Sequence, residues 1–444
     1  MSPREEELIE LLHKEVKPAL GCTEPIAVAL AAAKAGEILS ENNQSAGIDT
    51  MEWRFDADFR IVVSVSGNIL KNGMGVGIPG TGMTGLPIAA ALGAVCGKSG
   101  YGLEVLKDIS EKSLIRAKEL VNSKKVCISV ADTDEILYVK ATVIYNGKDN
   151  ASATIRKDHD NITETSLDGK ILFSCNGNTG GAGKCRDKAI SDYQLSVKEI
   201  YRFATETSYD DIKFILEDKK LNLALSNEGL SGEYGLRVGK TIMENQDSVF
   251  GDDFMSYAMA LTSAASDARM AGCSLPAMSN SGSGNQGITV SMPVIAYALK
   301  YGVEDEDLAR ALIISNLLAI HIKGYLGKLS ALCGCVVAAT GSSCGIVYLK
   351  GGSYKEICSA IKNMIGNITG MVCDGAKVGC AMKVASGVSC AIQSAVLALK
   401  GICISENDGI IEKDIEKTIS NLGSIGKDGM KNTDNMILKI MACK

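Results

Sequence analysis

Histidine is scarce in this chain of 444 residues, which contains only His13, His159 and His321. Zinc and non-haem iron sites are commonly built on histidine, and the sequence has no HExxH motif. We therefore do not expect a histidine-built metal site. The sequence also has no CxxC pair and no ferredoxin-type run of cysteines. These absences exclude zinc-ribbon spacings and the simple bacterial ferredoxin pattern.

The chain also lacks a basic tract or stripe, and its net charge is −6 with a pI near 5.4. This charge balance argues against nucleic acid as the main partner. The first residues, MSPREEELIELL, are acidic and amphipathic, unlike a signal or transit peptide. We expect a cytoplasmic protein that acts on a small molecule, with a homodimer as its simplest assembly.

A dense run of leucine, isoleucine and phenylalanine, as in a membrane span, is missing as well. Three uncharged stretches, 72–97, 271–299 and 329–349, exceed the ~20 residues that cross a bilayer. Glycine, serine, asparagine, threonine or proline interrupts each of them. We therefore interpret these stretches as buried segments around a site, and we expect no membrane association.

Cysteine, in contrast, is abundant, with 15 residues. The odd number, the missing export signal and the length of the chain favour reduced thiols over a disulfide framework. The density is highest late in the chain, in LSALCGCVVAATGSSCG (Cys333, Cys335, Cys344) and GMVCDGAKVGCAMK (Cys373, Cys380). Each cysteine could be a small core residue. The other reading is a cluster held by three thiolates, which leaves one iron open as a Lewis acid.

The hydrophobic patterns predict an α+β fold. Residues 4–40 have helical spacing with a break at 21–25, residues 52–66 resemble a strand, and residues 103–121 resemble a helix. Residues 125–174 alternate in polarity and contain an Asn-Gly pair at 146–147, which predicts a β-hairpin.

The same patterns predict three regions. Residues 1–48 are expected to form helices that pack on the helical domain, and residues 49–188 a smaller domain that bears the sheet. Residues 189–444 are expected to form a large helical domain that carries the site. Residues 175–190, CNGNTGGAGKCRDKAI, are typical of a linker.

Three glycine-rich stretches resemble nucleotide-binding motifs. GVGIPG (75–80) and GSGNQG (282–287) fit GxGxxG, but neither directly follows a predicted strand and opens a helix. NTGGAGKC (178–185) lacks the first glycine of a P-loop, and Cys185 replaces the hydroxyl that would hold magnesium. We do not expect nucleotide binding, although such loops could bind a carboxylate through backbone N–H groups.

A further cysteine, Cys22 of LGCTEP, precedes a predicted helix. The N-terminus of a helix carries partial positive charge, which favours ionisation of a thiol. Local sequence leaves three interpretations open for Cys22: a nucleophile, a metal ligand or a small buried residue.

Six motifs occur in order along the chain: LGCTEP, SGNILKNGMGVGIPGTG, DARMAGC, SNSGSGNQG, LCGC and GMVCDGAKVGCAMK. With them the chain resembles the cysteine desulfidase family, in the superfamily of iron–sulfur L-serine dehydratase α-chains. The resemblance implies a [4Fe-4S] cluster with one open iron and no pyridoxal phosphate. It implies Cys22, Cys333 and Cys373 as the ligands. The PCIERN motif of related L-serine dehydratases is missing, and Cys335 and Cys380 are alternative ligands.

The resemblance also implies a reaction, the β-elimination of L-cysteine to sulfide, ammonia and pyruvate through 2-aminoacrylate. One alternative is an iron–sulfur L-serine or threonine dehydratase, in which a hydroxyl replaces the thiol. Another is a non-catalytic cluster-binding or redox-sensing protein. Long uncharged, glycine-rich segments suit a closed substrate pocket better than an exposed sensor.

Candidate substrate contacts and bases follow from residue chemistry within these motifs. For the substrate we expect the SNSGSGNQG loop, a bidentate arginine, two asparagines of SGNILKN and an acid beside Cys22; these are Ser281, Ser283, Asn285, Gln286, Arg269, Asn68, Asn72 and Glu24. For the base we expect a desolvated lysine or the late histidine; these are Lys71, Lys377 and His321. Each could instead be structural: a turn, a surface ion pair, a helix cap or a core histidine.

Overall fold

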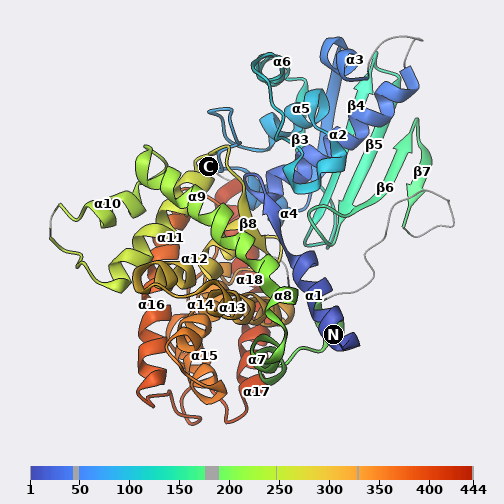
Figure 1. The fold of residues 1–444 in the computed structure, drawn as a ribbon. Helices are drawn as coiled ribbons and strands as arrows, with labels where there is room; N and C mark the ends of the chain where they lie inside the picture. The colour runs from blue at the N-terminus through green and yellow to red at the C-terminus, as the bar shows by residue number, and fades with distance from the viewer. Residues whose placement is uncertain (1, 44–49, 176–189, 247, 328–329, 443–444) are drawn as a thin grey trace.

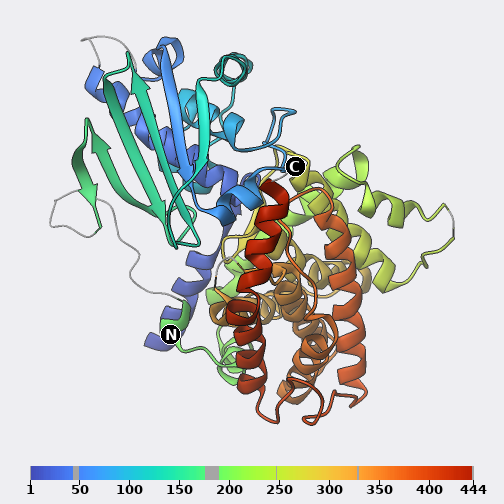
Figure 2. The ribbon, with the colours of Figure 1, turned by 180° about the vertical axis from the view of Figure 1, so that it is seen from behind.

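The computed structural model describes residues 2–43, 50–175, 190–246, 248–327 and 330–442. Its described part is an α+β fold, as the sequence predicts, with a sheet region and a larger helical region (Figures 1 and 2). The predicted linker at 175–190 lies outside the described residues except for its two ends.

One mixed sheet in the order β3-β2-β4-β5-β6-β7 forms the sheet region. Only β2 and β3 are parallel. The strands are β2 (Phe59–Val65), β3 (Val126–Val130), β4 (Tyr138–Tyr145), β5 (Asp149–Arg156), β6 (Ile162–Leu167) and β7 (Lys170–Ser174). The predicted hairpin is confirmed between β4 and β5, where Asn146 and Gly147 have φ values of 51° and 70°. Positive φ at both positions is what a tight hairpin turn requires.

Helices cover one face of this sheet (Figure 1). They are α2 (Thr23–Asn43), α3 (Thr50–Asp56), α5 (Leu86–Cys96) and α6 (Glu111–Asn122), with the 3-10 helix η1 (Ser99–Glu104) beside them. The alanine-rich α2 and α5 approach closely, because a Cβ on Gly93 would lie 2.2 Å from the carbonyl oxygen of Ala29. Alternate residues of β2, from Phe59 to Val65, are buried beneath the helices.

The helical region is built around one continuous apolar core. Its helices are α7 (Val197–Glu206), α8 (Tyr209–Ile212), α9 (Glu217–Ser231), α10 (Val238–Glu244), α11 (Phe254–Met270), α12 (Gly284–Tyr301), α13 (Asp305–Leu326), α14 (Gly334–Leu349), α15 (Tyr354–Ile368), α16 (Cys380–Leu399), α17 (Ile415–Ser424) and α18 (Lys431–Ala442). Short turns complete it: η2 (Ile190–Tyr193), η3 (Lys213–Leu216) and the π-helical η4 (Ile425–Gly429).

The first residues of the chain join the two regions. Helix α1 (Pro3–Glu15) packs into the core of the helical region. Strand β1 (Val16–Ala19) then pairs antiparallel with β8 (Ala277–Asn280), and α2 continues into the core of the sheet region. The expected packing of both N-terminal helices on the helical domain therefore applies to α1 and not to α2. The predicted domain boundaries stay a prediction.

Four local interpretations need correction. Residues 16–19 are a strand and not part of a helix, because β8 supplies a long-range partner that local spacing does not reveal. Residues 50–56 are helix α3, so the predicted strand begins only at Phe59. SGNILKN forms helix α4 (Gly67–Gly73) and not a solvated turn, and α4 packs against α18 (Figure 2). Of the helix predicted at 103–121, residues 111–121 are helical.

The three uncharged stretches divide into loops and buried helices. They contain α5, β8 with α12, and α14, and the loops before α5 and α12 contain glycine. Among the described residues one helix, Cys380–Leu399, is long and apolar enough to cross a membrane, and half of its most apolar window is buried in the fold. A core helix of a globular protein has the same properties.

The close approach of α2 and α5 yields a stability prediction. We expect Gly93→Ala to lower the free energy of unfolding by about 1–3 kcal/mol, because the new methyl group would overlap the Ala29 carbonyl. Denaturant unfolding measures this change. Gly100→Ala is the matched control, since a Cβ there meets nothing within 4 Å. Equal stability of the two variants would contradict the close packing of α2 on α5.

Candidate active site

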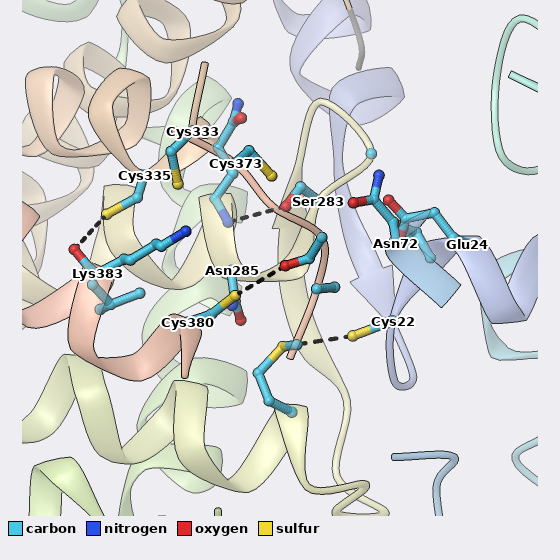
Figure 3. Close-up of a pocket in the computed structure, with 18 of the residues that line it drawn as sticks. Cys22, Glu24, Asn72, Ser283, Asn285, Cys333, Cys335, Cys373, Cys380 and Lys383 are labelled. Atoms are coloured by element: carbon cyan, nitrogen blue, oxygen red, sulfur yellow. Dashed lines mark hydrogen bonds between the residues drawn. The ribbon is translucent and has the colours of Figure 1, made fainter. Parts of the chain in front are cut away.

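A cavity of about 110 Å³ lies where the sheet region meets the helical region (Figure 3). The start of α2, helix α4 and the β5–β6 turn contribute from the sheet side. The helical side contributes the end of α11, the loop before α12, the start of α14 and the segment from Cys373 to Val384. Segments that are distant in sequence therefore share one wall.

Five thiols line this cavity: Cys22, Cys333, Cys335, Cys373 and Cys380. They include all three predicted ligands and both alternatives. Figure 3 shows their side chains arranged around the same space. Of the 12 free cysteines among the described residues, the other seven do not line it.

Cys333 and Cys373 are held together by a short antiparallel bridge between Leu332 and Val372. The N–H of Cys333 donates to the Met371 carbonyl at 3.0 Å, and the N–H of Cys373 donates to the Ala331 carbonyl at 2.7 Å. Alternate residues of paired segments point to the same face, so both thiols project to one side of the bridge. Two motifs forty residues apart thus become one structural unit.

Cys335 and Cys380 lie at the starts of two neighbouring helices, α14 and α16. The Cys335 thiol donates to the Lys383 carbonyl at 3.2 Å, and the missing side chain of Gly387 leaves it room. The Lys383 ammonium donates to the Val372 carbonyl at 2.8 Å and also contacts Asp374. Lys383 therefore ties α16 to the segment that carries Cys373.

Cys22 lies at the other end of the pocket (Figure 3). It directly precedes α2, its carbonyl accepts the N–H of Ile26 at 3.2 Å, and its sulfur lies 3.6 Å from that of Met270. Cys22, Met270 and Cys380 pack in one small apolar cluster. Cys22 thus shares the cavity with Cys333 and Cys373. Cys380 packs against the small cluster that contains Cys22, and both remain candidates for the third ligand.

Burial is the main influence on the pKa values of two thiols in the pocket, Cys22 and Cys333. It raises the pKa of the Cys22 thiol to about 12, against the opposing effect of Arg269. Burial also raises the pKa of Cys333 to about 12, with the neighbouring Cys373 thiol adding to the shift. The expected easy ionisation of Cys22 at a helix N-terminus is therefore not found, because desolvation of the thiol raises its pKa. A neutral thiol is a poor nucleophile, so Cys22 suits a metal-ligand role better.

The donor set of the pocket fits an iron–sulfur cluster better than a single ion. No three His, Cys, Asp or Glu side chains among the described residues are placed to hold one metal ion. A cluster distributes its thiolates over several iron atoms and is held by cysteine sulfur, which five thiols can supply. Metal binding would also ionise these thiols, since a coordinating thiol is deprotonated.

The loop SNSGSGNQG places three of its four predicted substrate contacts in the pocket wall: Ser283, Asn285 and Gln286. The Ser283 hydroxyl accepts the N–H of Gln286 at 3.3 Å and caps α12. Ser281 does not line the cavity. Its hydroxyl donates to Asn280 at 2.9 Å and its N–H donates to the Glu15 carbonyl.

Arg269 is 4% exposed and lines the pocket, but its guanidinium is largely engaged within the protein. One terminal nitrogen donates to the Gly21 carbonyl at 2.9 Å, and the other donates to the Asn285 side chain at 3.1 Å. The expected bidentate contact with a substrate carboxylate is therefore not supported. Arg269 instead fastens the loop before Cys22 to the loop before α12.

Among the remaining predicted contacts, Glu24 and Asn72 line the cavity, whereas Asn68 does not. None of the three predicted bases lines it. Lys71 is buried in an ion pair with Asp434 of α18, and Lys377 forms an ion pair with Asp374. Both ammonium groups are thus engaged by carboxylates outside the cavity, and this position does not suit a base that acts on a substrate inside it.

The third predicted base, His321, points elsewhere. Its Nε2 lies 2.7 Å from a carboxylate oxygen of Glu416 in α17, and its ring meets Tyr325 edge-on. The core alternative for this histidine fits better than the catalytic one.

The structure adds one histidine that sequence reasoning missed. His159 lies in the turn between β5 and β6, is 2% exposed, and lines the cavity. Its Nε2 is 3.9 Å from the carboxylate of Glu24, and Gly282, with φ of 78°, leaves room for the ring. The adjacent Asp160 forms a 2.6 Å ion pair with Lys17 of β1, which anchors the turn. Only the flanking aspartates marked this turn in the sequence.

Two lysines in the wall, Lys323 of α13 and Lys383 of α16, also escaped the sequence analysis. Both lie in helices whose local pattern indicates ordinary core packing. Lys383 is the last residue of the GMVCDGAKVGCAMK motif, which could have marked it, whereas nothing in the sequence near Lys323 distinguishes that lysine.

Comparison with known proteins gives one family and a set of relatives. The model of the serine dehydratase alpha chain family matches residues 100–439. A UPF0597 protein of Oleidesulfovibrio alaskensis is 49% identical over 100% of this chain and 99% of its own length. UPF0597 proteins of Phocaeicola vulgatus and Shewanella halifaxensis are 47% and 45% identical, covering 100% and 98% of this chain and 98% of each relative.

Proposed function

Because the chain belongs to the serine dehydratase alpha chain family, we propose that it is an amino-acid lyase. Its proposed reaction converts L-cysteine and water into pyruvate, ammonia and hydrogen sulfide. The observation that carries this proposal is the cavity itself, in which five thiols share one wall with polar groups suited to an amino acid. The GCTEP segment and the missing PCIERN motif favour cysteine over serine as the substrate.

The proposed cofactor is a [4Fe-4S] cluster held by Cys333, Cys373 and a third thiol, Cys22 or Cys380. When bound, such a cluster supplies an open iron that can act as a Lewis acid toward the sulfur leaving group. The chain must supply the rest: hold the amino and carboxylate groups, move the α-proton and exclude water. The buried walls suit the exclusion of water, since most lining residues are nearly inaccessible.

For the carboxylate, the proposal uses Ser283 and the first N–H groups of α12. Helix α12 begins at Gly284 in the cavity wall, and the first N–H groups of a helix have no partner inside the helix. This agrees with the expected carboxylate contact of the SNSGSGNQG loop, although Arg269 is not needed for it.

For the base, the proposal replaces Lys71, Lys377 and His321 with His159. His159 removes the proton from the α-carbon, the C–S bond breaks, and sulfur leaves with the bonding electrons. Glu24, which lies 3.9 Å from the imidazole, orients the ring and favours its protonated form after the transfer. The product, 2-aminoacrylate, tautomerises and hydrolyses to pyruvate and ammonia without further help.

The second candidate function is an L-serine or threonine dehydratase, which would use the same contacts with water as the leaving group. The family name favours it. A cluster-binding sensor without catalysis is the third candidate, but the buried, multi-walled cavity suits enclosure of a substrate better.

A substrate assay separates these candidates. We expect protein purified without oxygen to contain iron and acid-labile sulfide, and to release pyruvate and sulfide from L-cysteine faster than pyruvate from L-serine. Faster turnover of L-serine or L-threonine would select the dehydratase. Protein that stays inactive on all three amino acids after cluster reconstitution would remove the enzyme proposal.

Single cysteine variants define the ligand set. We expect Cys333→Ala, Cys373→Ala and Cys22→Ala to lose most of the bound iron after reconstitution, because each removes one of three thiolates. Iron analysis and visible absorption measure the loss. Cys344→Ala is the control, since Cys344 is fully buried but does not line the pocket. Iron retained in Cys22→Ala and lost in Cys380→Ala would transfer the third position to Cys380.

His159→Gln tests the base. We expect kcat to fall by about 10²–10⁴-fold, which is typical for loss of a general base, while bound iron stays at the wild-type level. His321→Gln is the matched control and should leave kcat near wild type, because His321 contacts Glu416 and not the cavity. The opposite pattern, an inactive His321→Gln and an active His159→Gln, would restore the sequence-based prediction.

A further inference from the structure

A row of side-chain amides runs from the pocket into the helical core. Gln286 Nε2 donates to Asn280 Oδ1 at 2.9 Å, and Asn280 Nδ2 donates to Asn316 Oδ1 at 2.8 Å. Asn316 Nδ2 then donates to a carboxylate oxygen of Asp218 at 2.9 Å. All four side chains are at most 1% exposed. Because each amide donates in the same direction, the row has a defined polarity.

Two main-chain carbonyls fix that polarity. Asn316 Nδ2 also donates to the Leu312 carbonyl at 3.0 Å, and Asn280 Nδ2 lies 3.3 Å from the carbonyl of Asn316. A carbonyl can only accept a hydrogen bond, so each asparagine must turn its NH₂ group toward it. Reversing the row would place oxygen against oxygen at both positions. The two asparagines therefore hold the side-chain oxygen of Asn280 toward Gln286.

The direction of the row determines which atom of the Gln286 side chain is left without a partner. Its NH₂ group faces Asn280, so its Oε1 faces away from the row. Oε1 is buried and has no hydrogen-bond partner among the residues that the structure describes. It lies beside the α-carbon of Gly334, where a Cβ would be only 3.1 Å from it. A buried acceptor without a partner is costly unless a ligand satisfies it.

We propose that Gln286 Oε1 accepts a hydrogen bond from the α-ammonium group of the substrate, and that the amide row selects for this group by presenting an acceptor. This inference rests on the proposed function, because it assigns a substrate contact at the same site. It corrects the expectation that Gln286 binds the carboxylate: a carboxylate has only acceptors and would be repelled by Oε1. The carboxylate is left to Ser283 and the start of α12.

Paired substitutions test the acceptor. We expect Gln286→Met to raise the KM for L-cysteine about ten- to a hundredfold, the usual effect of losing a hydrogen bond to a charged group. Inhibition by 3-mercaptopropionate, which lacks the amino group, should stay within about twofold of wild type, because that compound never made the bond.

The matched control is Gln393→Met, the same change at an exposed site on α16, and it should leave both constants unchanged. If Gln286→Met weakens L-cysteine and 3-mercaptopropionate equally, Gln286 only shapes the pocket and the proposal is overturned. Unchanged binding of both compounds also overturns it. If Gln286→Met does not fold, Gln286→Ala gives the same comparison.

Failure of the proposed function is a separate result. It appears as a wild-type protein that turns over neither L-cysteine nor L-serine. Ligand-induced thermal shifts then test the contact without turnover. A shift caused by L-cysteine or L-serine, lost in Gln286→Met and kept in Gln393→Met, supports the ammonium contact. No shift of the wild-type protein with either amino acid overturns it.

Discussion

Four helices begin at one cavity, and the chemistry of the site depends on this convergence. Helices α2, α12, α14 and α16 all place their first residues in the wall. Each helix start carries partial positive charge, so the cavity favours negative ligands. Four of the five thiols lie at these starts: Cys22, Cys333, Cys335 and Cys380. Burial acts in the opposite direction, because it raises the pKa of the Cys22 and Cys333 thiols. A bound cation would relieve this cost of burial, since a coordinating thiol is deprotonated.

Long-range contacts, and not local sequence, produce the convergence. The β1–β8 pair brings the start of α2 beside the loop before α12, and Arg269 fastens the two loops. The bridge between Leu332 and Val372 aligns Cys333 with Cys373. Lys383 ties the latter segment to α16. Each link is a hydrogen bond or ion pair between segments that are far apart in the chain, so the pocket requires both regions of the fold.

The same long-range character explains how much could be predicted from the sequence. Most of the residues that line the cavity could be predicted from motifs rich in cysteine and glycine. Such residues are recognisable in the sequence without knowledge of their distant partners. The hairpin at Asn146-Gly147 and the helical second half were equally visible. The proposed base was not visible locally, because His159, Lys71 and His321 differ in distant partners, which are Glu24, Asp434 and Glu416. Lys377 pairs with Asp374 only three residues away. Strand β1 was missed for the same reason, since only β8 makes it a strand.

Hydrogen-bond donors and a hydrogen-bond acceptor lie at different places in the pocket, and they suit the two charged groups of an amino acid. Donors at the helix starts and the acceptor Oε1 of Gln286 match a carboxylate and an ammonium group. Both groups are shared by cysteine, serine and threonine, so these contacts cannot distinguish the three. Discrimination must therefore come from the wall that faces the side chain, which is the wall of thiols. A soft metal centre prefers sulfur over oxygen as a ligand. With the proposed cluster held by this wall, that preference would favour a thiol substrate over an alcohol, although the family is named for serine.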